Sequence, residues 1–235
     1  MLIPTPNDSA PFGWSRRRLG LAALALAAAT ACSDASSPGS GDFYEWRLIV
    51  AAPGGAGDDS LTFHWPQNRL PVRIWVEDAA DLPGHVTAGL AAWRRGLQQT
   101  QFAGAVVGDS ASADVIVRAG GGPGAQFARV RLHSALAPQC SGATDLDITP
   151  DHTQLRLPVR IYVDPRTDPN APGLEECLAL TTTHELGHAL GIWRHSDSAS
   201  DIMFADPSVS MPSDRDLQTA QQAYRQSPNV TLATP

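Results

Sequence analysis

Two histidines four residues apart, with a glutamate between them, constrain this 235-residue chain more than any other feature. On an α-helix His184 and His188 project from the same face, so their imidazoles can share one metal ion. Glu185 follows His184 directly, where its carboxylate can polarise a water molecule on such an ion. The segment therefore predicts a metal site on a helix, with a carboxylate that acts on water.

The residues after this helix supply a turn and a third histidine. Gly191 is free to take the left-handed conformation that commonly ends a helix, which would send the chain back toward the metal. His195 then arrives as the third ligand. Three imidazoles, one open position and one nearby carboxylate form the layout of a catalytic zinc site, whereas structural zinc sites are closed by four protein ligands.

An aspartate after His195 is the alternative third ligand, namely Asp197, Asp201 or Asp206. A carboxylate of Asp197 or Asp201 could instead accept a hydrogen bond from a ligand imidazole, or simply be solvated in the loop. Other H-E-x-x-H zinc sites take a glutamate from a later helix as third ligand. That arrangement is excluded here, because no glutamate occurs after Glu185.

The stretch from His184 to His195, with the methionine that follows it, resembles the metzincin clan of zinc endopeptidases. The pattern of that clan is H-E-x-x-H-x-x-G-x-x-H followed by a methionine-containing turn. Within the clan, His-Glu-Leu-Gly-His-Ala-Leu-Gly and Ser196 are most similar to the matrixins, and Asp-Ile-Met-Phe around Met203 is similar to the turn. One position departs from the pattern. The third histidine is expected where Arg194 stands, and because a permanent cation cannot bind zinc, His195 takes the role one residue late.

The resemblance covers residues 178–226 and implies both a fold and an activity. The fold is α+β (mixed α/β): a twisted, mostly parallel sheet backed by two helices, with the zinc helix, a Met-turn and a C-terminal helix. The activity is that of an exported zinc-dependent endopeptidase of the bacterial lipoprotein type. Zn²⁺ would be held by His184, His188 and His195, Glu185 would be the general base, and Gly191 and Met203 would support the site. The alternative is a non-catalytic cell-surface binding module on a decayed metzincin scaffold, against which the retained Glu185 argues.

Hydrophobic periodicity predicts the elements around the site. Strands are expected over residues 70–77, 113–118, 127–132 and 155–163, and helices over 83–99, 174–190 and 213–226. Asp81 is a candidate start for the first helix, and Ser213 with Asp216 resembles an N-cap pair for the last. The catalytic domain is predicted to span 61–228, followed by a tail over 229–235.

Residues 1–31 have the composition of an export signal. Three arginines, Arg16–Arg18, precede an apolar run that ends at Ala31 and is too short to span a bilayer. Ala-Thr-Ala-Cys ending at Cys32 resembles a bacterial lipoprotein cleavage box, with Cys32 as the lipidated first residue and residues 32–60 as a lipidated N-terminus and flexible tether. The predicted location is a bacterial membrane, with the protein anchored by its lipid and facing the periplasm or the exterior. A freely secreted protein is the alternative.

Three cysteines fit this location. If Cys32 is lipidated, Cys140 and Cys177 remain as a pair in an oxidising compartment. A disulfide between them would pin the start of the zinc helix to the preceding loop. Two unpaired buried thiols are the alternative.

The remaining composition bears on ligands and partners. A net charge of −7, with no lysine and no basic stripe, gives no support to nucleic-acid binding. We expect a monomer that acts on a peptide or protein substrate and meets a membrane only through its N-terminal lipid. Asp145, Asp147 and Asp151 are candidate Ca²⁺ ligands, with solvated turn residues as the alternative. Four further histidines lack an H-x-H or H-x-x-x-H partner, so surface or core roles are predicted for them: His64, His85, His133 and His152.

Overall fold

In the part of the chain that the structure describes, a mixed β-sheet of seven strands runs through the folded unit. In sheet order its strands are β4 (Gly104–Val107), β3 (Val72–Val76), β5 (Val115–Ala119), β8 (Gln154–Pro165), β7 (Cys140–Ile148) and β6 (Val130–Ser134), and β9 (Thr231–Leu232) pairs with the start of β8. The run from β4 to β8 is parallel, as is the pairing of β9. β7 is antiparallel to β8, and β6 is antiparallel to β7.

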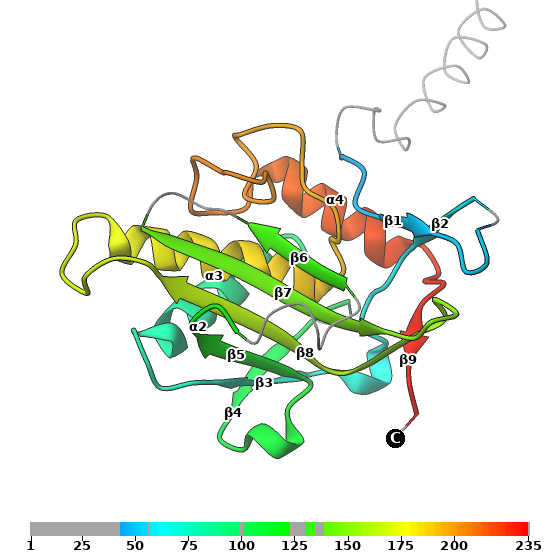
Figure 1. Ribbon diagram of the computed structural model, residues 1–235, viewed down its shortest axis with the longest axis horizontal. Coiled ribbons are helices and arrows are strands. Elements are labelled where there is room, and N and C mark those ends of the chain that lie inside the picture. Colours follow the sequence, from blue (N-terminus) through cyan, green and yellow to red (C-terminus); the bar gives the residue numbers. More distant parts are fainter. Residues whose placement is uncertain (1–42, 56, 99–100, 123–129, 135–138, 235) are drawn as a thin grey trace, which may run out of the picture. The chain divides into compact units, whose positions relative to one another are not determined.

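Helices α2 (Leu82–Arg94) and α3 (Leu174–Leu190) pack against each other and against the sheet (Figure 1). A third helix, α4 (Asp214–Arg225), follows the loop after α3. Short 3-10 turns occur at Gln67–Arg69 and Ser110–Ser112, and a separate hairpin is formed by β1 (Leu48–Ala51) and β2 (Asp58–Leu61). The predicted mixed α+β class with a mostly parallel sheet is confirmed.

The computed structural model describes residues 43–55, 57–98, 101–122, 130–134 and 139–234. The predicted signal over 1–31, Cys32 and the Ser/Gly/Pro-rich start of the predicted tether lie outside these residues. Within the described part of the chain, no helix combines the length and the apolar character that crossing a membrane requires.

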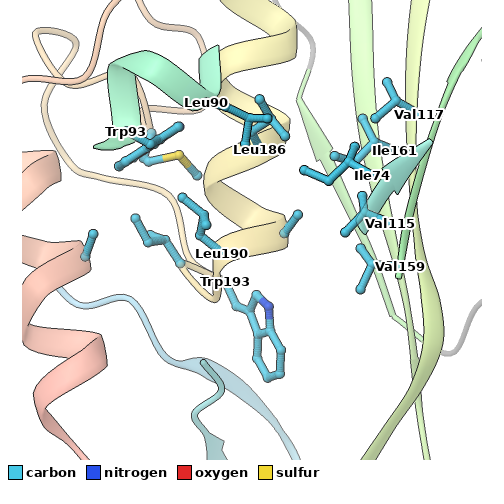
Figure 2. Close-up of a cluster of buried hydrophobic side chains, with 14 of the residues drawn as sticks. Ile74, Leu90, Trp93, Val115, Val117, Val159, Ile161, Leu186, Leu190 and Trp193 are labelled. Carbon is cyan, nitrogen blue, oxygen red and sulfur yellow. The ribbon is translucent and has the colours of Figure 1, made fainter. Parts of the chain in front are cut away.

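The core lies between the two packed helices and the sheet. Strand β3 shows how the sequence builds it: its alternating valines and isoleucine are buried, and Arg73 between them points to solvent. Figure 2 shows Leu90 and Trp93 of α2 beside Leu186 and Leu190 of α3, with strand side chains facing them. The strand side chains labelled there are Ile74, Val115, Val117, Val159 and Ile161. This packing fixes α3, and with it the predicted metal ligands, against a rigid sheet.

The folded unit begins earlier than the sequence predicts. Tyr44 and Trp46 are buried, and the carbonyl of Trp46 accepts a hydrogen bond of 2.8 Å from the backbone N–H of Trp193. The hairpin β1–β2 follows directly. The tether predicted for 32–60 is therefore wrong from residue 43 onward, because buried aromatic side chains hold that segment in the domain. The tail predicted for 229–235 is likewise wrong where β9 joins the sheet.

A disulfide joins the sheet to the start of α3. Cys140, the first residue of β7, is bonded to Cys177 on α3, with the two Cα atoms 6.1 Å apart and a sequence separation of 37. Both residues are buried. The pairing is the one the sequence predicts, but the bond pins the first turn of α3 to strand β7 and not to a loop.

Replacing both cysteines, Cys140→Ala/Cys177→Ala, is expected to lower the free energy of unfolding by about 4 kcal/mol, because a closed loop of this length restricts the unfolded chain. Urea unfolding of the oxidised wild type and the variant measures the difference. Wild type unfolded under a reductant is the control and should match the variant. Equal stability of the oxidised wild type and the variant would contradict a stabilising role for the bond.

Candidate metal centre

Helix α3 brings two histidines and the glutamate together as its sequence predicts. His184, Glu185 and His188 have fully buried side chains. The Nε2 atoms of His184 and His188 lie 3.1 Å apart, so both rings aim at one point. The helix begins and ends at the residues predicted for it, between Gly173 and Gly191, which both adopt left-handed φ angles.

Gly191 turns the chain so that the third histidine reaches the same point. Its φ of 109° is strained for residues with a Cβ, and a Cβ there would overlap the carbonyl of Phe63. Beyond this turn, the Nε2 of His195 lies 3.2 Å from the Nε2 of His188, while Arg194 is exposed. The loop after Gly191 accommodates one residue more than the metzincin pattern has. His195 therefore reaches the cluster, and the exposed Arg194 is not part of it.

Backbone carbonyls orient the two buried imidazoles. The Nδ1 of His184 donates to the carbonyl of Ile202 at 2.6 Å, and the Nδ1 of His188 donates to the carbonyl of Ile192 at 2.6 Å. Since a carbonyl can only accept, each Nδ1 carries the proton and each Nε2 keeps its lone pair toward the centre. Partners of this kind fix the ring and its tautomer at metal sites.

The aspartates considered for this role are engaged elsewhere. Asp201 is buried and accepts hydrogen bonds from Ser196, Ser213 and Arg215, and the exposed Asp197 pairs with the same arginine at 2.7 Å. The hypothesis that Asp197 or Asp201 accepts a hydrogen bond from a ligand imidazole is therefore wrong for His184 and His188. Asp201 instead ties the start of α4 to the loop that follows His195.

The electrostatics of the cluster favour neutral rings. Burial and, to a smaller extent, the neighbouring His195 lower the pKa of His184 to about 3. Burial, with His184 and His195 close by, also holds the pKa of His188 well below its ordinary value. Two unprotonated nitrogens 3.1 Å apart repel each other unless a cation lies between them. Three imidazole nitrogens that lie within 4.8 Å of one another form a donor set that fits Zn²⁺.

The turn around Met203 packs against α3 next to the histidine cluster. Met203 is fully buried, and its sulfur lies against Gly187, where a Cβ would overlap it. The carboxylate of Asp216 on α4 accepts the backbone N–H of Ile202 at 2.7 Å and that of Met203 at 3.3 Å. It therefore holds the residue whose carbonyl orients His184. The predicted N-cap pair is confirmed, because the side chains of Ser213 and Asp216 form a capping box.

Strand β7 positions the carboxylate of Glu185. Thr144 donates its hydroxyl to Oε2 of Glu185 at 2.6 Å. The other carboxylate oxygen lies against Gly142, where a Cβ would overlap it. The glutamate is thus held between its own helix and the adjacent strand, beside the two histidines that flank it. Nothing in the local sequence marks Gly142 or Thr144 for this role.

A pocket of about 330 Å³ lies along the N-terminal half of α3, before the turn that carries His184. Leu180, four residues before His184 and therefore on the same helix face, is part of its wall. Residues 207–210, from the loop after Met203, form the opposite wall, and Val209 contributes an apolar side chain there. The pocket is thus built from the same helix and the same loop as the histidine cluster.

The three aspartates considered for Ca²⁺ are held by separate partners. Asp145 pairs with Arg131 at 2.6 Å, Asp147 lies 3.5 Å from Arg156, and Asp151 accepts hydrogen bonds from neighbouring threonines. They are not among the converging groups of ligands in the described residues, which are the histidine cluster and a second group on α2 and α3.

Comparison of the chain with models of protein families and with curated proteins finds no match.

Proposed function

We propose that the protein is a zinc-dependent endopeptidase of the metzincin type. The observation that carries the proposal is the convergence of three imidazole nitrogens, from His184, His188 and His195, on the helix that also carries the buried carboxylate of Glu185. A site that only bound a structural metal would need a fourth protein ligand and no buried carboxylate next to it. This site has three nitrogen ligands and a carboxylate that is oriented from a neighbouring strand.

His184, His188 and His195 would hold the zinc ion. Bound there, zinc supplies Lewis acidity, which polarises a scissile carbonyl and lowers the pKa of a water molecule. The carbonyls of Ile202 and Ile192 keep the ligand rings in the tautomer that presents Nε2. Met203 and Gly187 provide an apolar floor, which excludes water from beneath the ligands.

Glu185 would act as the general base and then as the general acid. Its carboxylate takes a proton from the attacking water and returns it to the leaving amine nitrogen of the cleaved peptide bond. The hydrogen bond from Thr144 to Oε2 restricts rotation of the carboxylate, so the base is preoriented for both transfers. Because Glu185 is buried, rotating its carboxylate away from Thr144 would leave a buried polar group without this hydrogen bond.

The pocket lined by Leu180 and Val209 would receive a side chain of the substrate. Its walls from Leu180 and Val209 are partly apolar, and its volume of about 330 Å³ is large enough for an amino-acid side chain. A peptide or protein is therefore the proposed substrate. A binding module on a decayed scaffold has less support, because such a scaffold has no need of a buried and oriented Glu185.

For location, we propose export and attachment to a bacterial membrane through lipid on Cys32, with secretion as the alternative. The disulfide between Cys140 and Cys177 supports an oxidising compartment outside the cytosol.

The one-residue shift of the third ligand gives a direct test. His195→Ala is expected to abolish peptide cleavage and to weaken zinc binding, since one of three ligands is removed. Arg194→Ala is the matched control and should change both only modestly, because that side chain is exposed. Cleavage rates and zinc affinities of both variants are to be measured. If His195→Ala retained wild-type cleavage while Asp197→Ala or Asp201→Ala lost it, the third ligand would be an aspartate.

A further inference from the structure

A second group of metal-ligating side chains lies where the first turns of α2 and α3 meet. Asp81 immediately precedes α2, His85 lies in its first turns, and Glu175 is the second residue of α3. One ligand atom from each of the three lies within 4.8 Å of the other two. They come from segments about ninety residues apart in the chain.

His85 is the member that points to a ligand. The residue is 6% exposed, and its Nε2 is buried without a hydrogen-bond partner. The nearest charged atom, Oε1 of Glu175, lies 3.4 Å away. A buried polar nitrogen without a partner is uncommon in native proteins, because desolvation makes it costly. The nitrogen therefore faces a place where a further atom would satisfy it.

The carboxylate of Asp81 could bind the same atom that would satisfy His85. It occupies the N-cap position of α2, where an aspartate ordinarily accepts a hydrogen bond from the backbone of the first turn, yet its side chain makes no such bond. Its carboxylate lies over Gly84, where a Cβ would approach Oδ2 to 2.9 Å. The glycine thus leaves room for the carboxylate beside His85.

We propose that Asp81, His85 and Glu175 form a second metal site, which takes a divalent first-row transition-metal ion such as Zn²⁺. One imidazole nitrogen and two carboxylate oxygens suit these ions, whereas Ca²⁺ selects oxygen ligands alone. The ion would satisfy the nitrogen of His85, offset the charges of the two carboxylates and join the beginnings of α2 and α3.

This site differs from the histidine cluster in place and in strength. Glu175 lies roughly 13 Å along the axis of α3 from His184, given the rise of a helix. Two of its three ligands are exposed, and the positive ends of two helix dipoles face it. We therefore expect weaker zinc binding than at the histidine cluster, with filling only when free zinc is supplied.

Zinc stoichiometry tests the proposal independently of catalysis. In equilibrium dialysis against added Zn²⁺, the His184→Ala/His188→Ala variant should bind one zinc ion per chain. Adding His85→Gln or Glu175→Gln should remove that ion. Adding Glu176→Gln is the matched control, since it deletes a neighbouring exposed carboxylate outside the group, and it should leave the stoichiometry at one.

A second measurement covers the case in which the double histidine variant does not fold. The otherwise wild-type chain should then bind two zinc ions at saturation, and its His85→Gln and Glu175→Gln variants one each. Added zinc should also raise the Tm of wild type more than that of Glu175→Gln, whose substitution lies at an exposed position. Equal stoichiometry in wild type, His85→Gln and Glu175→Gln would overturn the second site. That result would leave the zinc endopeptidase proposal untouched, because the histidine cluster would still hold its own ion.

Discussion

Glu185→Gln is expected to keep the fold and the zinc ion while lowering the rate of peptide cleavage about 10²–10⁴-fold, the usual contribution of a general acid–base group. The substitution keeps the shape of the side chain and an oxygen that can accept the hydroxyl of Thr144. It removes only the ability to take a proton from water. The loss should therefore appear in kcat rather than in metal content.

The measurement is cleavage of a peptide library by wild type and Glu185→Gln, with zinc determined in both proteins. Asp214→Asn serves as the control for loss of a carboxylate, since Asp214 is exposed on α4, and it should retain cleavage and zinc. Equal cleavage rates for wild type and Glu185→Gln would remove Glu185 as the base. A variant without zinc would instead place Glu185 among the residues that hold the metal.

The ends of the helices that carry the site could be predicted from the sequence because local chemistry sets them. Gly191 ends α3 through a left-handed φ, and the side chains of Ser213 and Asp216 cap α4 reciprocally. The spacing of His184 and His188 on one helix likewise needs no distant partner. The position of His195 also follows from the sequence, since Arg194 cannot bind a metal.

Strand β7 could not be predicted, because it is buried on almost every residue and so lacks the alternation that marks a half-exposed strand. The two residues that orient Glu185 lie on it. Gly142 and Thr144 acquire that role only through the packing of β7 against α3, which joins segments some forty residues apart.

The hydrogen-bond partners of the His184 and His188 imidazoles could also not be predicted from the sequence. The sequence offers Asp197 or Asp201 as a candidate acceptor, but the acceptors are the backbone carbonyls of Ile192 and Ile202, and every residue has such a carbonyl. The role of Asp216 in holding Ile202 depends in turn on how α4 packs. The grouping of His85 with Glu175 has the same origin, since it exists only where two distant helices begin side by side.

His184→Ala/His188→Ala is expected to abolish both tight zinc binding and cleavage, the largest effect in this protein. Removing two of three imidazoles leaves His195 alone, and a single partly exposed imidazole holds zinc weakly. Dialysis against zinc-free buffer before analysis empties the weaker second site, so the remaining metal reports on the histidine cluster.

The most direct test is therefore zinc analysis and peptide-library digestion of wild type and His184→Ala/His188→Ala, both after that dialysis. We predict about one zinc ion per chain and cleaved peptides for wild type, and neither for the variant. Chelation should stop cleavage by wild type, and zinc should restore it. Full zinc content in the variant would contradict the proposed metal centre, and zinc-loaded wild type that cleaves no peptide would contradict the proposed endopeptidase and favour a binding module.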